Sequence, residues 1–324
     1  MSSDDWGLDM KLDSVKHIGI VGLGMIGGSL AVLTTGHGYR TTCVDLAEMI
    51  PAFRKTYEGY FRQMIDQGLM PEEQLAICEK YLKYSTDYDD LADCDVIFEC
   101  VTENIDVKHE IYARIEETCP SIRAICSVSS SLVPDVLAEK AAKYKDRIIV
   151  THPFNPAHMV PFFELCGGSA TDDGVLAFAK ELLESLDRKP VILKKPAPGF
   201  IGNRLQFALW REALNLVESG IADPRDVDTC LNYSFCPRYT SIGIFEHFDN
   251  GDLTLNMRTC NGVFPSLSNM TEAPPAITER VARGDLGAKT GVGFYDWRDV
   301  DMDAYRKRVN APYWHFIDWD MPKE

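Results

Sequence analysis

A glycine-rich turn between a short apolar run and an apolar helix is the feature that most constrains this chain. Residues 17–21, HIGIV, predict a buried strand and lead directly into a G-x-G-x-x-G pattern, which opens the helix. One glycine of such a pattern allows the tight turn, one lets the backbone approach a pyrophosphate, and one lets the helix pack closely on the strand. The residues of this turn predicted to bind a dinucleotide are Gly22, Leu23, Gly24, Met25, Ile26 and Gly27.

Asp45 adds the second half of this signal. It ends the next predicted strand, 18 positions after Gly27, where a carboxylate accepts hydrogen bonds from a ribose 2′-hydroxyl and repels a 2′-phosphate. The pattern therefore favours NAD over NADP as the cofactor. Arg40 is the nearest basic residue before Asp45, and it is the one nearby group that would suit a phosphate.

Short apolar or β-branched runs alternate with helix-like stretches along the first part of the chain. Such alternation predicts an α/β domain with a Rossmann-type parallel sheet. Residues 47–83 look helical with a break before Pro71, which predicts a helical hairpin inserted after the second strand. The predicted strands lie at residues 17–23, 41–46, 94–101, 124–130, 147–153, 161–168 and 189–195.

The strand signals fade after residue 196. Apolar residues then recur at spacings of three and four from 198 to 220, which predicts a long helix ended by Gly220. We therefore expect an all-α C-terminal domain, followed by a charged, aromatic tail to which we assign no element. The predicted division is an N-terminal extension 1–15, an NAD-binding Rossmann domain 16–196, a helical domain 197–298 and a tail 299–324.

Composition excludes several classes of partner. Lys and Arg number 33 against 49 Asp and Glu, a formal charge of −16, and a deficit of basic residues argues against nucleic acid or an anionic membrane as the main partner. The 10 cysteines form no C-x-x-C pair and the acidic run 87–95 matches no calcium loop, so no metal site is expected. An acidic start without an apolar core predicts no secretory signal, and a reduced cytoplasmic location is the simplest expectation.

The segment HPFNP, which begins at His152, carries the catalytic signal. His152 ends a predicted strand, where open α/β sheets place their ligand crevice. An imidazole exchanges protons near neutral pH and can take a hydroxyl proton as hydride leaves the same carbon. Glu164, on the next predicted strand, can fix the imidazole tautomer and stabilise the imidazolium. The alternative is a buried histidine held by backbone groups, with Glu164 as an exposed strand residue.

Several segments together resemble the L-3-hydroxyacyl-CoA dehydrogenase superfamily, over roughly residues 16–297. The resemblance implies a Rossmann domain, a helical second domain that forms much of a homodimer, and catalysis by His152 as base with Glu164 orienting it. It also implies that Ser130 and Asn203 hydrogen-bond the reacting oxygen. The choice among Ser129, Ser130 and Ser131 stays open. The segments are GLGMIG, FECVTENIDVK (98–108), SVSSSL (127–132), HPFNPAHMVPFFE (152–164), PGFIGNRLQ (198–206) and KTGVGFYDW (289–297).

The same resemblance makes Glu103, Lys108 and Lys289 contacts of the cofactor. Each has a plainer alternative, and for Lys108 it is a solvated helix residue beside acidic neighbours. Asn203 can instead be a hydrogen-bonding residue at a helix start. His158 either touches substrate or is an ordinary loop histidine.

Two branches of the superfamily differ in substrate. Members that oxidise fatty acyl-CoA hold coenzyme A with a Ser and a Lys on the long helix after the second strand, and the corresponding positions here are Phe61 and Gly68. The branch acting on free acids, which includes gulonate dehydrogenase (lambda-crystallin) and carnitine dehydrogenase, is therefore favoured, although KTGVGFYDW is more typical of the acyl-CoA branch. We expect NAD-dependent oxidation of a small 3-hydroxy acid. The alternatives are a short-chain L-3-hydroxyacyl-CoA dehydrogenase and a non-catalytic NAD-binding structural or sensor protein.

Charge is unevenly distributed along the chain. Residues 188–211 hold six basic residues and no acidic one. This strip predicts a local positive potential for an anionic substrate, with a solvated strand end as the alternative. Arg188 begins the strip and Arg211 ends it.

Overall fold

The computed structural model describes residues 10–323, and the chain divides into two compact units. One unit comprises the chain up to Ile201 together with the stretch from Lys307 onward, and the other runs from Gly202 to Arg306. The first unit ends close to the boundary expected at residue 196. Of the expected N-terminal extension, the first nine residues lie outside the described residues.

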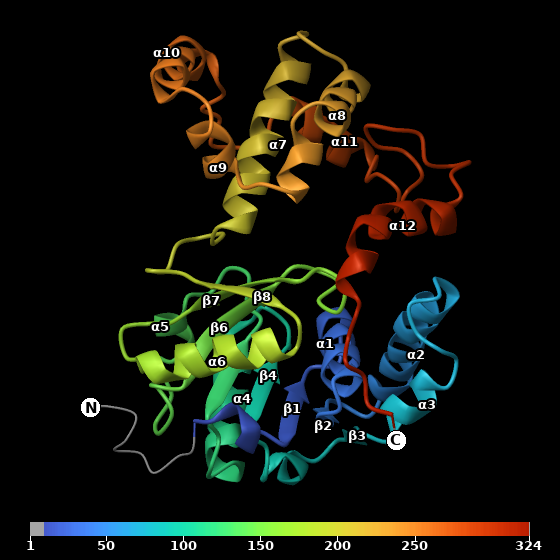
Figure 1. Ribbon diagram of the computed structural model, residues 1–324, viewed down its shortest axis with the longest axis vertical. Coiled ribbons are helices and arrows are strands. Elements are labelled where there is room, and N and C mark those ends of the chain that lie inside the picture. The colour runs from blue at the N-terminus through green and yellow to red at the C-terminus, as the bar shows by residue number, and fades with distance from the viewer. Residues whose placement is uncertain (1–9, 324) are drawn as a thin grey trace. The chain divides into compact units, whose positions relative to one another are not determined.

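The first unit is built on an eight-stranded sheet in the order β3-β2-β1-β4-β5-β6-β7-β8 (Figure 1). All neighbouring strands are parallel except β6 and β7, which are antiparallel. The predicted Rossmann-type sheet is confirmed. Its strands are β1 His17–Val21, β2 Arg40–Val44, β3 Leu82–Ser85, β4 Val96–Glu99, β5 Ala124–Ser127, β6 Ile148–Pro153, β7 Phe162–Cys166 and β8 Lys189–Ile192.

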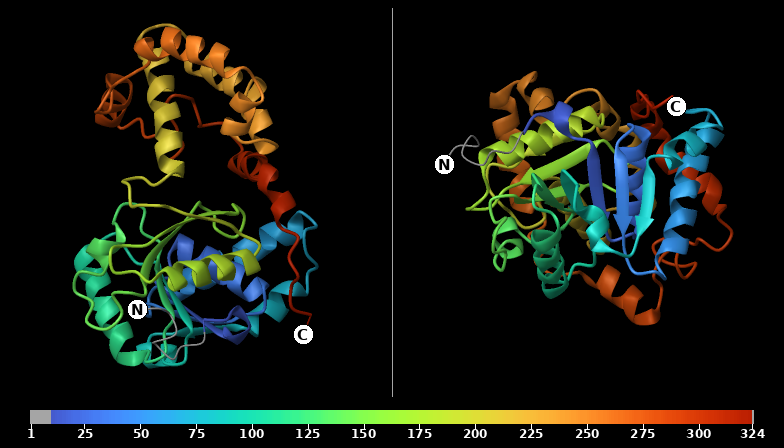
Figure 2. Two further views of the ribbon diagram at one scale, coloured as in Figure 1. Left: turned by 60° about the vertical axis from the view of Figure 1, so that its left-hand side comes forward. Right: turned by 90° about the horizontal axis from the view of Figure 1, so that it is seen from below.

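Helices cover both faces of this sheet (Figure 2). One core cluster joins Ile18 and Ile20 of β1 to α1, α2 and α6, and a second joins Ile97 of β4 and Ile125 of β5 to α4 and α5. Alternate side chains of a strand point to opposite faces, so strands covered on both sides are largely apolar on both faces. The helices of this unit are α1 Met25–Gly36, α2 Ile50–Asp66, α3 Gln74–Glu79, α4 Ile105–Thr118, α5 Pro134–Leu137 and α6 Asp173–Ser185.

The predicted helical hairpin corresponds to α2 and α3, but its predicted end at residue 83 is wrong. Residues 82–85 form β3, which pairs with β2 at the edge of the sheet. Only partly buried, β3 has no apolar run that could predict a strand. Helix α2 packs through Phe53, Tyr57 and Phe61 into the core cluster that contains α1.

The second unit is helical, and the prediction of an all-α C-terminal region is confirmed. The long helix predicted between residues 198 and 220 is α7, and Gly220 follows it with φ of 66°. Among the described residues from 202 to 306, extended pairing is limited to isolated bridges at Gly287, Val292 and Asp296. The helices are α7 Gly202–Glu218, α8 Pro224–Tyr233, α9 Ile244–Asp249, α10 Leu253–Val263 and α11 Pro275–Arg283, and α12 Met302–Asn310 leads out of the unit.

The end of the chain, to which the sequence assigned no element, packs on the first unit. After a 3-10 helix at Ala311–Phe316 it runs beside α1 towards α3, in red in Figure 1. Ile317 and Trp319 are buried in the core cluster that contains α1. The side-chain amide of Gln74 in α3 donates to the carbonyl oxygen of Pro322 at 3.1 Å.

Arg188 is covered by this segment. Its side chain is 1% exposed and its guanidinium lies 5.8 Å from the centre of the Trp319 ring. Arg188 therefore does not belong to an exposed basic strip, and the prediction for that residue is wrong. The sequence could not show this because the covering residue lies far along the chain.

His158 is fully buried between helices of the first unit, which excludes it as a substrate contact. Its Nδ1 lies 2.8 Å from the hydroxyl of Ser29 in α1, and its ring centre lies 4.4 Å from that of Tyr60 in α2. Burial, together with the charge of Arg188, lowers the pKa of His158 to about 3. The unfolded chain binds a proton at this imidazole near pH 6.5, whereas the folded protein does not until near pH 3.

We therefore expect stability to be lost as the pH falls from about 6.5 towards 3, because the unfolded state binds the extra proton. His158→Gln cannot titrate, so its free energy of unfolding should depend less on pH in this window, by about 1 kcal/mol per pH unit. Chemical denaturation followed by circular dichroism between pH 4 and 7 measures the slope. His315→Gln, which removes an exposed imidazole, is the control. Equal slopes for His158→Gln and the unmodified protein would contradict the assignment.

Candidate functional site

The three glycines of the turn after β1 differ in what a side chain at each position would meet. Gly22 has φ of 94°, and a Cβ there would lie 2.6 Å from the carbonyl carbon of Cys100. A Cβ on Gly27 would lie 2.1 Å from the carbonyl oxygen of Gly22, so this position holds α1 close to the turn. A Cβ on Gly24 would meet no described atom within 4 Å. Gly24 therefore offers open backbone at the start of α1, which suits the approach of a pyrophosphate.

The other residues of the turn frame this opening. Leu23 is 3% exposed and Ile26 packs against the core, whereas Met25 is 60% exposed. Asp45, at the end of β2, accepts the backbone N–H of Leu23 at 2.6 Å and that of Leu46 at 2.7 Å. The predicted acidic residue thus stands directly beside the glycine turn, and the residues present fit a dinucleotide.

Glu103 organises the serine-rich loop after β5. Its Oε1 accepts the Ser129 hydroxyl at 2.6 Å, the Ser131 hydroxyl at 2.8 Å, and the backbone N–H groups of Ser130 and Ser131 at 3.2 and 3.1 Å. Burial would raise the pKa of Glu103, but these hydrogen bonds and the charge of Lys108 outweigh it and lower that pKa. Ser130 is exposed, and unlike the hydroxyls of its two neighbours, its own is not bound to Glu103.

A buried charge network lies behind this loop. The Lys108 ammonium is 2.7 Å from Oε1 of Glu99 and 3.4 Å from Oε2 of Glu103. Glu99 also accepts the hydroxyls of Tyr112 and Ser127, both at 2.7 Å. The side chains of Lys108 and Glu99 are fully buried, so Lys108 is not the solvated helix residue of the alternative reading.

Sequence reasoning missed Glu99. The available signal was an acidic residue at the end of an otherwise apolar strand, in the run CDVIFECV at residues 94–101. Such a carboxylate is costly to bury unless several donors satisfy it. Lys108, Tyr112 and Ser127 supply those donors here.

His152 and Glu164 face each other across β6 and β7. The antiparallel register pairs the two residues directly, and Nδ1 of His152 lies 2.8 Å from Oε2 of Glu164. Glu164 is fully buried, which rules out the alternative of an exposed strand residue, and its Oε1 accepts the backbone N–H of Ile201 at 2.6 Å. A carboxylate on Nδ1 selects the tautomer with the proton there, which leaves the Nε2 lone pair to accept a proton.

Two aromatic rings and the loop after β6 lie beside His152. The ring centres of Phe154 and Phe200 lie 5.8 and 5.4 Å from its own. Beyond Phe154, the Asn155–Pro156 bond is cis, and the Asn155 amide donates to the Met25 sulfur at 3.3 Å. The loop after the histidine strand therefore contacts the glycine turn.

These groups lie at the carboxyl ends of the parallel strands. The glycine turn, Asp45, the serine loop and His152 follow or end β1, β2, β5 and β6, which are parallel members of the sheet, and Glu103 follows β4. Carboxyl ends of parallel strands form the ligand crevice of open α/β sheets. The structure thus brings together the predicted residues that the first unit supplies.

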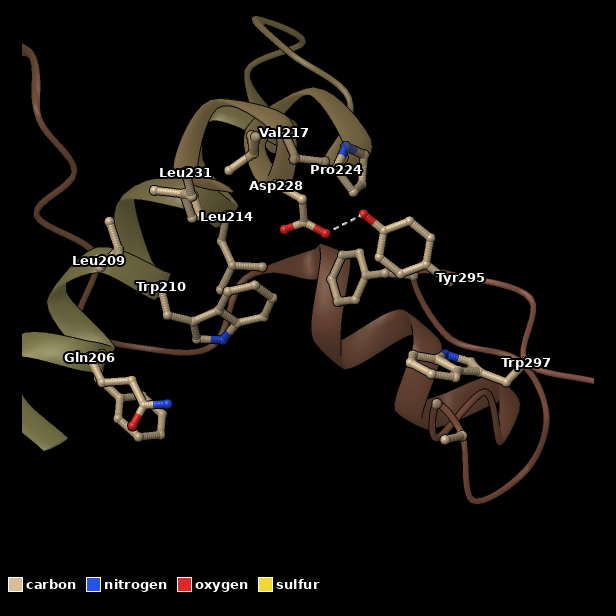
Figure 3. A pocket seen from close by; sticks show the side chains of 16 residues that line it. Gln206, Leu209, Trp210, Leu214, Val217, Pro224, Asp228, Leu231, Tyr295 and Trp297 are labelled. Carbon is tan, nitrogen blue, oxygen red and sulfur yellow. Dashed lines mark hydrogen bonds between the residues drawn. The ribbon is translucent and has the colours of Figure 1, made fainter. Parts of the chain in front are cut away.

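The two remaining predicted residues belong to the helical unit. Asn203 lies in the first turn of α7, and Lys289 is exposed in the loop between α11 and α12. This unit also contains an apolar pocket of about 580 Å³, lined by Trp210, Phe294 and Trp297 among others, with the Tyr295 hydroxyl donating to Asp228 at 2.6 Å (Figure 3). Neither Asn203 nor Lys289 lines it.

No group of three or more His, Cys, Asp or Glu side chains within residues 10–323 is placed to hold a metal ion. Over the same residues, no helix combines the length and the apolar character that crossing a membrane requires.

Comparisons with known proteins show to which family this chain belongs. The model of the 3-hydroxyacyl-CoA dehydrogenase NAD binding domain matches residues 17–196, and that of the C-terminal domain matches residues 199–297. An L-carnitine dehydrogenase of Oceanobacillus iheyensis is 32% identical over 285 residues, covering 85% of this chain and 90% of the relative. The 5-formyl-3-hydroxy-2-methylpyridine 4-carboxylate 5-dehydrogenase of Mesorhizobium japonicum is 27% identical over 284 residues, covering 87% and 90%.

A solved structure shows the same fold over nearly the whole chain. The crystal structure of a 5-formyl-3-hydroxy-2-methylpyridine 4-carboxylic acid 5-dehydrogenase, described as an NAD+ dependent dismutase, superposes with a TM-score of 0.83 at 25% identity. The match covers 93% of this chain and 97% of that one. Because the two family models span both the sheet and the helical unit, this chain belongs to the 3-hydroxyacyl-CoA dehydrogenase family.

Proposed function

We propose that this protein oxidises the 3-hydroxyl of a small 3-hydroxy acid to the 3-oxo acid, with NAD as cofactor. The hydrogen-bonded pair of His152 and Glu164 carries the proposal, because it stands at the edge of the sheet that also bears the glycine turn. Bound NAD would supply the hydride acceptor. His152 accepts the hydroxyl proton at Nε2, and Glu164 stabilises the positive charge that appears on the imidazole.

Two residues are proposed to fix the reacting oxygen. Ser130 is favoured over its neighbours because the hydroxyls of Ser129 and Ser131 are both engaged by Glu103. Asn203 follows Ile201, whose N–H is bound to Glu164, by two residues. Chain connectivity therefore keeps the Asn203 backbone within about 7 Å of that anchor.

We propose Glu103, Lys108 and Lys289 as further contributors on the cofactor side. For Lys108 the buried position supports an indirect role, because its ammonium reaches Glu103 but not solvent. Lys289 is exposed and so is available to a ligand. Glu103 is partly exposed and bears the loop that presents Ser130.

A free acid is favoured over a coenzyme A thioester. Phe61 is fully buried in the core and Gly68 lies in a turn with φ of 71°, so neither position offers the polar side chain that would hold coenzyme A. The carnitine dehydrogenase relatives are named for oxidation of a free acid. A short-chain acyl-CoA remains the alternative substrate, on the strength of the KTGVGFYDW segment.

The activity is tested by following NADH absorbance with gulonate, carnitine, 3-hydroxybutyrate and 3-hydroxybutyryl-CoA. We expect turnover with at least one free acid, and His152→Gln should lower kcat by roughly 10²- to 10⁴-fold while NAD affinity, measured by calorimetry, is unchanged. His315→Gln, with an exposed imidazole removed, is the control. Preference for the thioester would contradict the free-acid assignment, and NAD binding with no turnover of any of the four would favour an NAD-sensing or structural role.

Two glycine variants test the cofactor site. Gly24 has φ of −72° and a Cβ there meets no described atom, so Gly24→Ala should leave the melting temperature nearly unchanged. Its methyl group fills the space of the pyrophosphate and should weaken NAD binding by roughly tenfold or more. Gly27→Ala forces Cβ onto the Gly22 carbonyl and should destabilise the fold by about 1–3 kcal/mol. Calorimetry and thermal unfolding separate the effects, and unchanged NAD affinity in folded Gly24→Ala would place the pyrophosphate elsewhere.

We also propose a homodimer formed through the helical unit. Within α7, the buried residues are Ala213 and Leu214, while Leu205 and Phe207 are more than 60% exposed. Phe245 in α9 is 88% exposed. These exposed apolar side chains on the helices support the proposed interface.

The ten free cysteines support the expected reducing, cytoplasmic location.

Analytical ultracentrifugation at micromolar concentration tests the dimer. We expect the mass of two chains, and Phe207→Asp together with Phe245→Asp should shift the protein towards one chain, because charges on a desolvated face weaken association. Val136→Asp, on an exposed position of the sheet unit, is the matched control. A monomeric unmodified protein would contradict the proposal.

A further inference from the structure

Among the described residues, Arg188 is the largest fully buried side chain, and its hydrogen bonds go to main-chain carbonyl groups. Its Nε donates to the Leu186 carbonyl at 2.9 Å, and its Nη1 donates to the carbonyls of Ala157 and His158 at 3.3 and 3.4 Å. Its Nη2 has no hydrogen-bond partner among the described residues. A buried cation held by main-chain carbonyls fixes the backbone that supplies them. Arg188 therefore holds, through hydrogen bonds, the loop that follows β6, the strand of His152.

The same loop connects the histidine strand to the cofactor helix. The His158 backbone N–H donates to the Ser29 hydroxyl at 2.9 Å, and His158 Nδ1 bonds the same hydroxyl. Asn155 contacts Met25 at the start of α1. Residues 154–160 therefore lie between His152 and the helix that begins at the glycine turn.

Trp319, near the C-terminal end of the chain, covers the guanidinium of Arg188. Its ring faces the guanidinium at 5.8 Å, lies 4.9 Å from the His37 ring, and is 6% exposed. A Cβ on Gly36 would lie 2.7 Å from the Trp319 ring, so glycine is what allows the ring to settle on α1. Without the indole, water would reach the guanidinium and compete with its bonds to the loop carbonyls.

We propose that Trp319 is a positioning residue for the dehydrogenase site: it covers Arg188, whose guanidinium holds residues 157 and 158, and so sets the loop between His152 and α1. The proposal rests on the proposed function, since the loop would keep His152, the proposed base, at a fixed position relative to the cofactor helix α1. The C-terminal segment is then part of the support of the site and not an appendage.

Backbone hydrogen exchange of the holoprotein, together with NAD affinity, tests this role. Trp319→Ala should speed exchange in a peptide covering residues 154–160 by roughly tenfold, with little change in β3, and weaken NAD binding by roughly three- to tenfold. Trp319→Phe keeps a ring over Arg188 and should restore most of both. Phe316→Ala, which removes an exposed aromatic ring from the same segment, is the matched control and should leave both unchanged.

Arg188→Met provides an independent route if Trp319→Ala fails to fold. It fills the volume but removes the donors, so it should produce the same local exchange, and Trp319→Ala should add little on top of it. Unchanged loop exchange and NAD affinity in either folded variant would overturn the proposal. A general rise in exchange, or an equal effect of Phe316→Ala, would also overturn it, because that is the mark of a merely structural tail. None of these measurements requires a substrate, whereas silence with every hydroxy acid would overturn the proposed function alone.

Discussion

The antiparallel pairing of β6 and β7 is the constraint on which the site depends. It is the one reversal in an otherwise parallel sheet, and it places His152 directly opposite Glu164. Two residues twelve positions apart thereby form a 2.8 Å hydrogen bond without a flexible loop between them and the sheet. A side-chain pair on paired strands keeps its geometry because the backbone ladder fixes both ends.

Carboxylates that accept several hydrogen bonds recur where the strands end, and two of them are fully buried while Glu103 is partly exposed. Glu164, Glu99 and Glu103 each accept several donors, from backbone N–H groups, hydroxyls or Lys108. Burying a carboxylate is unfavourable unless its lone pairs are satisfied, so each one imposes an order on the loops around it. Glu103 orders the serine loop in this way. It accepts the hydroxyls of Ser129 and Ser131 but only the backbone N–H of Ser130.

A buried charge with several hydrogen bonds also lies beneath the C-terminal segment, at Arg188. Arg188 is a buried cation that bonds to carbonyls, and Trp319 is the apolar cover that keeps water from them. The chain leaves the sheet unit after Ile201 and returns to the sheet unit at Lys307, so both ends of the helical unit are connected to the sheet unit. A change at residue 319 can reach the loop beside His152 through two contacts.

The elements with strong local signals were predictable from the sequence. Apolar strands, the glycine turn with Asp45 and the helix ended by Gly220 all carry their signal within a few residues. The edge strand β3 carried none, because half-exposed residues lack an apolar run. Glu99 was missed because its donors come from other elements, and burial of Arg188 depends on a residue more than a hundred positions away.

The sequence by itself determined the family and the cofactor class, and it led to the proposed roles of His152 as base and Glu164 as its orienter, because these depend on residue type and spacing. The tertiary structure alone decided that the hydroxyls of Ser129 and Ser131 bind Glu103, that Lys108 is buried against Glu99 and Glu103, and that Trp319 covers Arg188. These facts concern which groups satisfy one another when buried. Such pairing is fixed by three-dimensional proximity, which spacing along one strand or helix does not encode.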